Sequence, residues 1–210
     1  MPPVEKPRLR GVSHQVAFFV TLALSPWLVV RAQPRFRWAV VAYLVTLAAQ
    51  FGTSALYHRP TWAPRPRQWL RRCDHATIFL LIAGTGTPIA VSLDPHHERL
   101  LLSILWAGAL VGVLRAIVWI TAPKWIVAAI AVTLGSVCFS FLPALGAVLD
   151  ATTVWLVATG GVLYILGATV YALRRPDPWP RTFGYHEVFH AFTILAAACD
   201  MVAVARIAFA

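Results

Sequence analysis

The chain has few charged residues, which make up only 12% of its 210 positions. A soluble domain of this size carries roughly 25% charged residues, so the composition excludes an ordinary water-soluble protein. Cysteine is also scarce, and Cys73, Cys138 and Cys199 are scattered along the chain. An odd, dispersed set of this kind provides neither a disulfide framework nor a cysteine-based zinc site.

Acidic residues are the scarcer charges, with 8 Asp and Glu against 18 Lys and Arg. A net charge of +10 can indicate nucleic-acid binding, but here the arginines lie in short segments between apolar runs. That placement is typical of positive residues retained on the cytoplasmic side of a membrane. We therefore expect an integral membrane protein with no nucleic-acid partner.

Long apolar runs dominate the rest of the sequence, and about 20 such residues cross a bilayer. The pattern predicts an all-α integral membrane protein, a single seven-transmembrane helix bundle over residues 1–210 with a short cytoplasmic tail at 1–11. The expected spans are Val12–Val30, Trp38–Tyr57, Ala76–Ser92, Leu100–Ile120, Trp125–Leu145, Thr153–Leu173 and Val188–Ala208.

The distribution of Lys and Arg predicts the orientation of these spans. Thirteen of them fall in the tail and the alternate loops on one side, and five fall on the other side. Because the side richer in Lys and Arg faces the cytoplasm, the N-terminus is expected inside and the C-terminus outside. The expected location is the inner (plasma) membrane, with multiple passes.

The last span opens on His186-Glu187-Val188-Phe189-His190. Two histidines four positions apart share one helix face, about 6 Å apart along the axis, which is a metal-chelating spacing. The same letters match the zincin signature, in which Glu187 would be the general base of an intramembrane zinc protease. Such a protein would resemble the site-2 protease family, which takes its third zinc ligand from an Asp-Gly motif later in the chain. Here Asp200 is followed by Met201 rather than by glycine, so that motif is missing after the pair.

A second set of polar residues falls at the same end of the predicted bundle. His58 closes the second span and Asp74 opens the third, so both lie with His186 and His190 on the cytoplasmic side. Ser54 lies one helical turn deeper than His58. We therefore predict a zinc site with His58, His186 and His190 as ligands and with Asp74 and Ser54 as catalytic residues. Three protein ligands and an open position are typical of catalytic zinc.

Several of these residues have simpler interpretations. Asp74 could cap the third helix, and Ser54 could be a packing residue bonded to its own backbone. His75 points about 100° away from Asp74 around the helix, so it is left out of the metal set. Asp200 lies roughly 15 Å beyond His190, deep in the last span, and needs a partner that the sequence does not identify.

Three motifs together carry a resemblance to a known family: Ser54 to His58, Cys73 to His75 with the following 80–88, and Phe183 to His190. They resemble the hemolysin III family, bacterial relatives of the progestin and adipoQ receptors with a distant relation to alkaline ceramidases. The resemblance implies seven spans with the N-terminus inside, three zinc-binding histidines, and an aspartate that contacts the zinc-bound water. Receptor relatives often carry Gln at the position of Glu187, which argues against Glu187 as an essential base.

The expected function is a zinc-dependent hydrolase that acts on an amide or ester of a membrane lipid, similar to a ceramidase. The alternative is a non-enzymatic membrane protein, either a cytolysin or a receptor-like sensor, whose zinc is structural. A pore is disfavoured, because the spans are continuously apolar and the polar residues gather at one depth, whereas a pore needs polar residues along its length.

Overall fold

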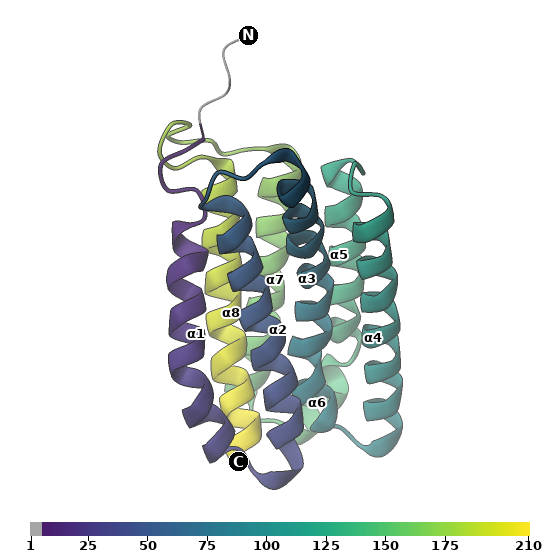
Figure 1. Ribbon diagram of the computed structural model, residues 1–210. Helices are drawn as coiled ribbons and strands as arrows, with labels where there is room; N and C mark the ends of the chain where they lie inside the picture. The colour runs from purple at the N-terminus through teal and green to yellow at the C-terminus, as the bar shows by residue number, and fades with distance from the viewer. Residues whose placement is uncertain (1–5) are drawn as a thin grey trace.

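A computed structural model describes residues 6–210, which form a bundle of helices that run roughly antiparallel to their neighbours in sequence (Figure 1). Of the predicted tail, residues 1–5 lie outside the described residues. The helices are α1 (Val12–Arg31), α2 (Pro34–His58), α3 (Pro64–Val91), α4 (Pro95–Val118), α5 (Lys124–Ser140), α6 (Leu142–Val148), α7 (Ala151–Leu173) and α8 (Tyr185–Phe209).

The surface of the bundle is suited to a lipid environment. Large apolar side chains point outward, and Val30, Val118 and Trp155 are each more than 70% exposed. Six helices are long and apolar enough to cross a membrane. The pair α5 and α6 makes a further span if it is counted as one, so the predicted all-α membrane fold is confirmed with six spans, or seven including the bent pair.

The fifth predicted span, Trp125–Leu145, is not a continuous helix. It divides at Phe141 into α5 and α6, whose axes differ by 45°. Pro143 explains the break, because proline has no N–H and its ring clashes with the carbonyl four residues earlier in a continuous helix. Hydropathy averaged over a window does not reveal this break, because the residues on both sides of it are apolar.

α3 is the central helix of the bundle. It packs against α2 on one side and α4 on the other, and α7 and α8 form the other large helix pair. Within its most apolar stretch 72% of the α3 residues are buried, compared with 17% for α1 and α7. Polar residues within this stretch of α3 therefore mostly face other helices rather than lipid.

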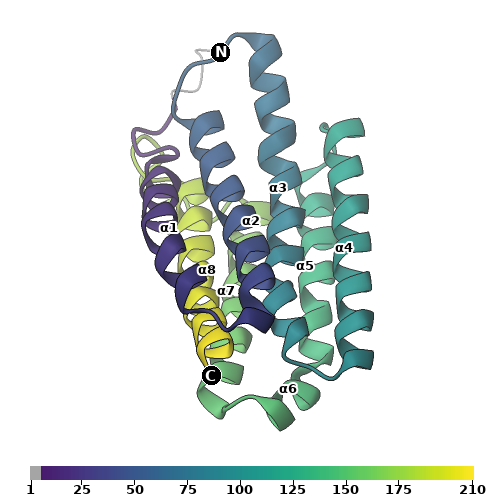
Figure 2. The same cartoon turned by 60° about the horizontal axis from the view of Figure 1, so that its bottom comes forward.

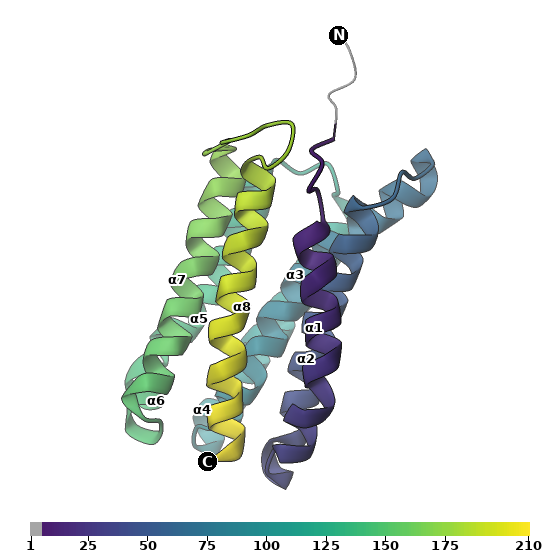
Figure 3. The same cartoon turned by 90° about the vertical axis from the view of Figure 1, so that its left-hand side faces the viewer.

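α3 also begins 12 residues before the predicted start at Ala76. Its first turns extend beyond the neighbouring helices and lean away from the bundle (Figures 2 and 3). Pro64 suits the first helical position, where no N–H is needed. Asp74 consequently lies ten residues inside the helix, so the interpretation of Asp74 as a helix cap is wrong.

α2, α4 and α8 also begin three or more residues earlier than predicted, because their first turns are polar. α4 begins at Pro95 instead of Leu100, and the Asp94 side chain caps it by accepting from the backbone N–H groups of His96 and His97. α8 begins at Tyr185 instead of Val188, which places His186 within the helix. A side-chain cap such as that of Asp94 on α4 stabilises a helix by about 0.5–2 kcal/mol.

Candidate metal centre

Three buried histidines from the second and last membrane helices meet at one end of the bundle. His58 is the final residue of α2, and His186 and His190 lie on the first two turns of α8. The Nε2 atoms of His58 and His186 are 3.1 Å apart. One ring nitrogen from each histidine lies within 4.8 Å of the other two, so the cluster could hold a metal ion. The structure thus brings together the three predicted ligands.

The predicted carboxylate and hydroxyl lie beside this cluster. Asp74 Oδ2 is 3.8 Å from His58 Nε2, and the Ser54 hydroxyl lies next to the Asp74 carboxylate. Ser54 and Asp74 are both buried. All five predicted site residues therefore converge, from α2, α3 and α8.

His14 of α1 is a further neighbour of the cluster, and it is not among the predicted site residues. Its ring stacks on that of His190, with centroids 3.7 Å apart and planes within 5°. Its Nε2 atom is 3.0 Å from the hydroxyl of Thr193, which lies on α8 near His190. This contact joins the faces of two helices that are far apart in the sequence, so no local sequence pattern predicts it. His14 fixes the plane of one candidate ligand.

Glu187 points away from the histidine cluster. One of its oxygens pairs with Arg10 from the segment before α1, and the other accepts the backbone N–H of Gly184 at 2.8 Å. The side chain is 2% exposed. Glu187 is therefore engaged in capping α8 and in holding the N-terminal segment, a geometry that does not support its role as a zincin-type base.

The N-terminal segment covers the outer side of the cluster. The N–H groups of Arg8 and Leu9 donate to the carbonyls of Arg181 and Thr182, in the loop before α8, each at 3.1 Å. Gly11 follows with a φ of +78°, and a Cβ added there would lie 2.7 Å from the Cβ of His58. This turn therefore needs glycine for its backbone conformation and for its close approach to His58.

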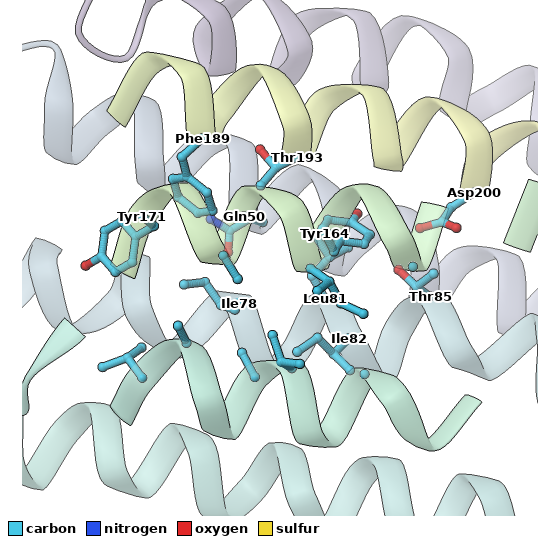
Figure 4. A pocket seen from close by; sticks show the side chains of 18 of the residues that line it. Gln50, Ile78, Leu81, Ile82, Thr85, Tyr164, Tyr171, Phe189, Thr193 and Asp200 are labelled. Atoms are coloured by element: carbon cyan, nitrogen blue, oxygen red, sulfur yellow. The ribbon is translucent and has the colours of Figure 1, made fainter. Parts of the chain in front are cut away.

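An elongated cavity of about 180 Å³ leads from the cluster into the bundle. It is lined by residues of α2, α3, α5, α7 and α8 and by His14 of α1, most of them apolar, and it reaches from His186 and His190 to Asp200. Figure 4 shows Tyr171 and Tyr164 of α7 along this cavity, opposite side chains of α3. His75 lines the cavity but does not belong to the histidine cluster, as predicted.

Comparison with known proteins agrees with the motifs. The family model described as haemolysin-III related matches residues 3–201, a range that includes every site residue described above. The protein named hemolysin-3 homolog from Bacillus subtilis (strain 168) is similar to the chain, with 25% identity over 191 residues that cover 88% of this chain and 85% of that protein. The chain belongs to the haemolysin-III related family.

Proposed function

We propose that this protein is a multi-pass zinc hydrolase of the inner (plasma) membrane, and that it cleaves an amide or ester bond of a membrane lipid. The observation that carries the proposal is the junction of the three-histidine cluster, with Asp74 beside it, and an apolar cavity inside the bundle. A cluster that served only to join helices would need neither a neighbouring carboxylate nor a cavity.

The residues present fit a zinc ion. Three imidazoles are the ligand set of one class of catalytic zinc site, in which a fourth position stays open. Zn–N bonds of about 2.0–2.1 Å in tetrahedral geometry place ligand nitrogens roughly 3.3 Å apart, and the Nε2 atoms of His58 and His186 are 3.1 Å apart. Bound at His58, His186 and His190, zinc would lower the pKa of water and polarise a carbonyl group.

Asp74 is positioned to move the proton in such a hydrolysis. Its carboxylate accepts a proton from the attacking water and returns it to the leaving amine or alkoxide, so that one water and one amide yield a carboxylate and an amine. The Ser54 hydroxyl lies beside the same carboxylate and orients it. This assigns Asp74 as general base and acid and Ser54 as its support.

The cavity supports a lipid substrate. Its apolar walls begin at the histidine cluster and continue about 15 Å along α8 to Asp200. An acyl chain placed there would bury its methylene groups, each contributing about 0.8 kcal/mol. The reacting carbonyl would then lie at the cluster, where Asp74 is found.

Metal analysis of the purified protein tests the ligands. The double variant His186→Ala/His190→Ala is expected to lose the bound zinc, whereas His97→Ala, at the exposed start of α4, is expected to keep it. Zinc that stays bound to the double variant would show that the ligands are elsewhere. Incubation with a panel of long-chain N-acyl amides and esters, followed by mass spectrometry of the products, then tests the hydrolase.

One observation favours a second candidate, a receptor-like or cytolytic membrane protein with structural zinc. The N-terminal segment and the stacked ring of His14 cover the cluster on two sides, as in a closed structural site. In that case Asp74→Asn would unfold the protein or leave it unchanged, and no lipid of the panel would be cleaved. A hydrolase would instead keep its fold and zinc in Asp74→Asn and lose turnover.

A further inference from the structure

The far end of the cavity holds a second polar cluster, which the proposed hydrolysis does not use. Asp200 of α8 is buried, and its Oδ2 atom has no hydrogen-bond partner among the described residues. The Thr85 hydroxyl is also buried without such a partner, and the buried Tyr164 hydroxyl has the Asp200 carboxylate as its neighbour. All three side chains line the cavity, and Figure 4 shows them near one end of it.

The backbone makes room for this carboxylate. Asp200 Oδ1 lies where a side chain at Gly160 would be, since a Cβ added to Gly160 would be 2.5 Å from it. The Tyr164 hydroxyl is close to the carboxylate from the same helix as Gly160. Gly160 thus leaves room for the buried carboxylate where α7 packs against α8, and Tyr164 lies beside it.

Thr85 is unusual among the threonines of the bundle. The hydroxyls of Thr46, Thr77 and Thr87 each donate to a carbonyl of the preceding helical turn, as threonine does in membrane helices. The Thr85 hydroxyl makes no such bond and lines the cavity instead. Its hydrogen-bonding capacity is therefore free for a ligand.

The charge of Asp200 is also uncompensated within the cavity. No Lys or Arg is found among the described residues that line it. A carboxylate at membrane depth is costly unless it is paired with a cation or protonated. The missing partner must therefore come from outside the described chain or be a proton.

We propose that Asp200, Tyr164 and Thr85 form a binding site for the primary amino group of a single-chain amphiphile. A primary ammonium has three N–H donors, and the cluster presents the carboxylate and two hydroxyls as three acceptors. The apolar walls between this cluster and the histidines suit the hydrocarbon chain of such a ligand. A neutral amine that enters the cavity takes the proton of the Asp200 carboxylic acid, which leaves an ammonium and a carboxylate in contact.

A sodium ion is the main competing occupant. Hard cations require about six or more oxygen ligands in a compact shell, whereas the remaining cavity walls here are largely apolar. An amphiphilic amine can donate hydrogen bonds to the three oxygens through its ammonium group and contact the apolar walls through its hydrocarbon chain. This site does not depend on a metal at the histidine cluster.

Binding of octylamine to the full chain in detergent tests the proposal, with octan-1-ol and octanoate as probes of equal chain length. Titration calorimetry is expected to show octylamine binding at least tenfold more tightly than octan-1-ol. Asp200→Asn is expected to weaken octylamine binding at least tenfold and to leave octan-1-ol unchanged. Asp150→Asn, an exposed aspartate outside this cavity, is the matched control and is expected to bind as the wild type does.

Three outcomes would overturn the proposal. They are equal affinity of the wild type for octylamine and octan-1-ol, unchanged octylamine binding by Asp200→Asn, and saturable stabilisation by NaCl that octylamine does not displace. If Asp200→Asn does not fold, the wild type is compared with octyltrimethylammonium, which carries the charge without N–H donors. Binding as tight as that of octylamine would then refute the three-donor site.

Discussion

Replacement of Gly11 by alanine tests whether the N-terminal segment shapes the histidine cluster. The left-handed conformation of Gly11 costs an L-residue about 1–2 kcal/mol. The new Cβ would also lie 2.7 Å from the Cβ of His58, about 1 Å closer than an ordinary contact, and overpacking of this kind typically costs about 1–3 kcal/mol. We therefore expect Gly11→Ala to destabilise the site by about 2–5 kcal/mol.

The cost can appear in either of two measurements. If His58 stays in place, the thermal midpoint in detergent falls, and if His58 moves, the zinc content of the purified protein falls. Gly146→Ala is the matched control, because a Cβ added there meets nothing within 4 Å and the residue is helical. Alanine is expected to be neutral or slightly stabilising at that position. A Gly11→Ala protein with unchanged midpoint and unchanged zinc content would refute the role of this contact.

Further predictions concern three acidic residues and the membrane orientation. Asp74→Asn should lower lipid hydrolysis about 10²–10⁴-fold while zinc content is unchanged, and equal losses of both would contradict a purely catalytic role. Glu187→Gln should keep zinc and activity but destabilise the protein by about 1–2 kcal/mol, because Arg10 loses its ionic partner. Loss of turnover without loss of stability would instead support Glu187 as a catalytic base. Hydrogen bonds from Thr153 and the nearby Arg206 lower the pKa of Asp150 from 3.8 to about 2. The charge-dependent part of the stability difference between wild type and Asp150→Asn should therefore be constant above about pH 5 and should be lost progressively as the pH falls to about 1. Reporter fusions should place the N-terminus in the cytoplasm and the C-terminus outside, and the reverse result would refute the positive-inside assignment.

The positions of the helices and of the three histidines could be predicted because membrane spans leave a strong apolar signal. Once the spans are counted, their alternating direction places His58, His186 and His190 at one end. The same argument places Asp74 there, although it cannot show that α3 extends outward to Pro64. Polar helical turns outside a membrane have no hydropathy signal, so the true environment of Asp74 required the structure.

The remaining features depend on which helix faces meet. The stacking of His14 on His190 and the approach of Gly11 to His58 join segments far apart in the sequence. The depth of Asp200 was predictable from helical rise, but its position at the end of a cavity depends on Gly160 of another helix. In the sequence, Pro143 is the one sign of the break at Phe141, and it does not predict a break because membrane helices often tolerate proline.

The origin of the histidines has a consequence for the order of assembly during synthesis. His58 is inserted with the second helix, whereas His186 follows 128 positions later on the last helix. A ribosome-bound chain that ends before α8 lacks two of the three candidate ligands and one wall of the cavity. Metal retention would therefore report that the last helix has been inserted, so truncated chains should leave the translocon without bound metal.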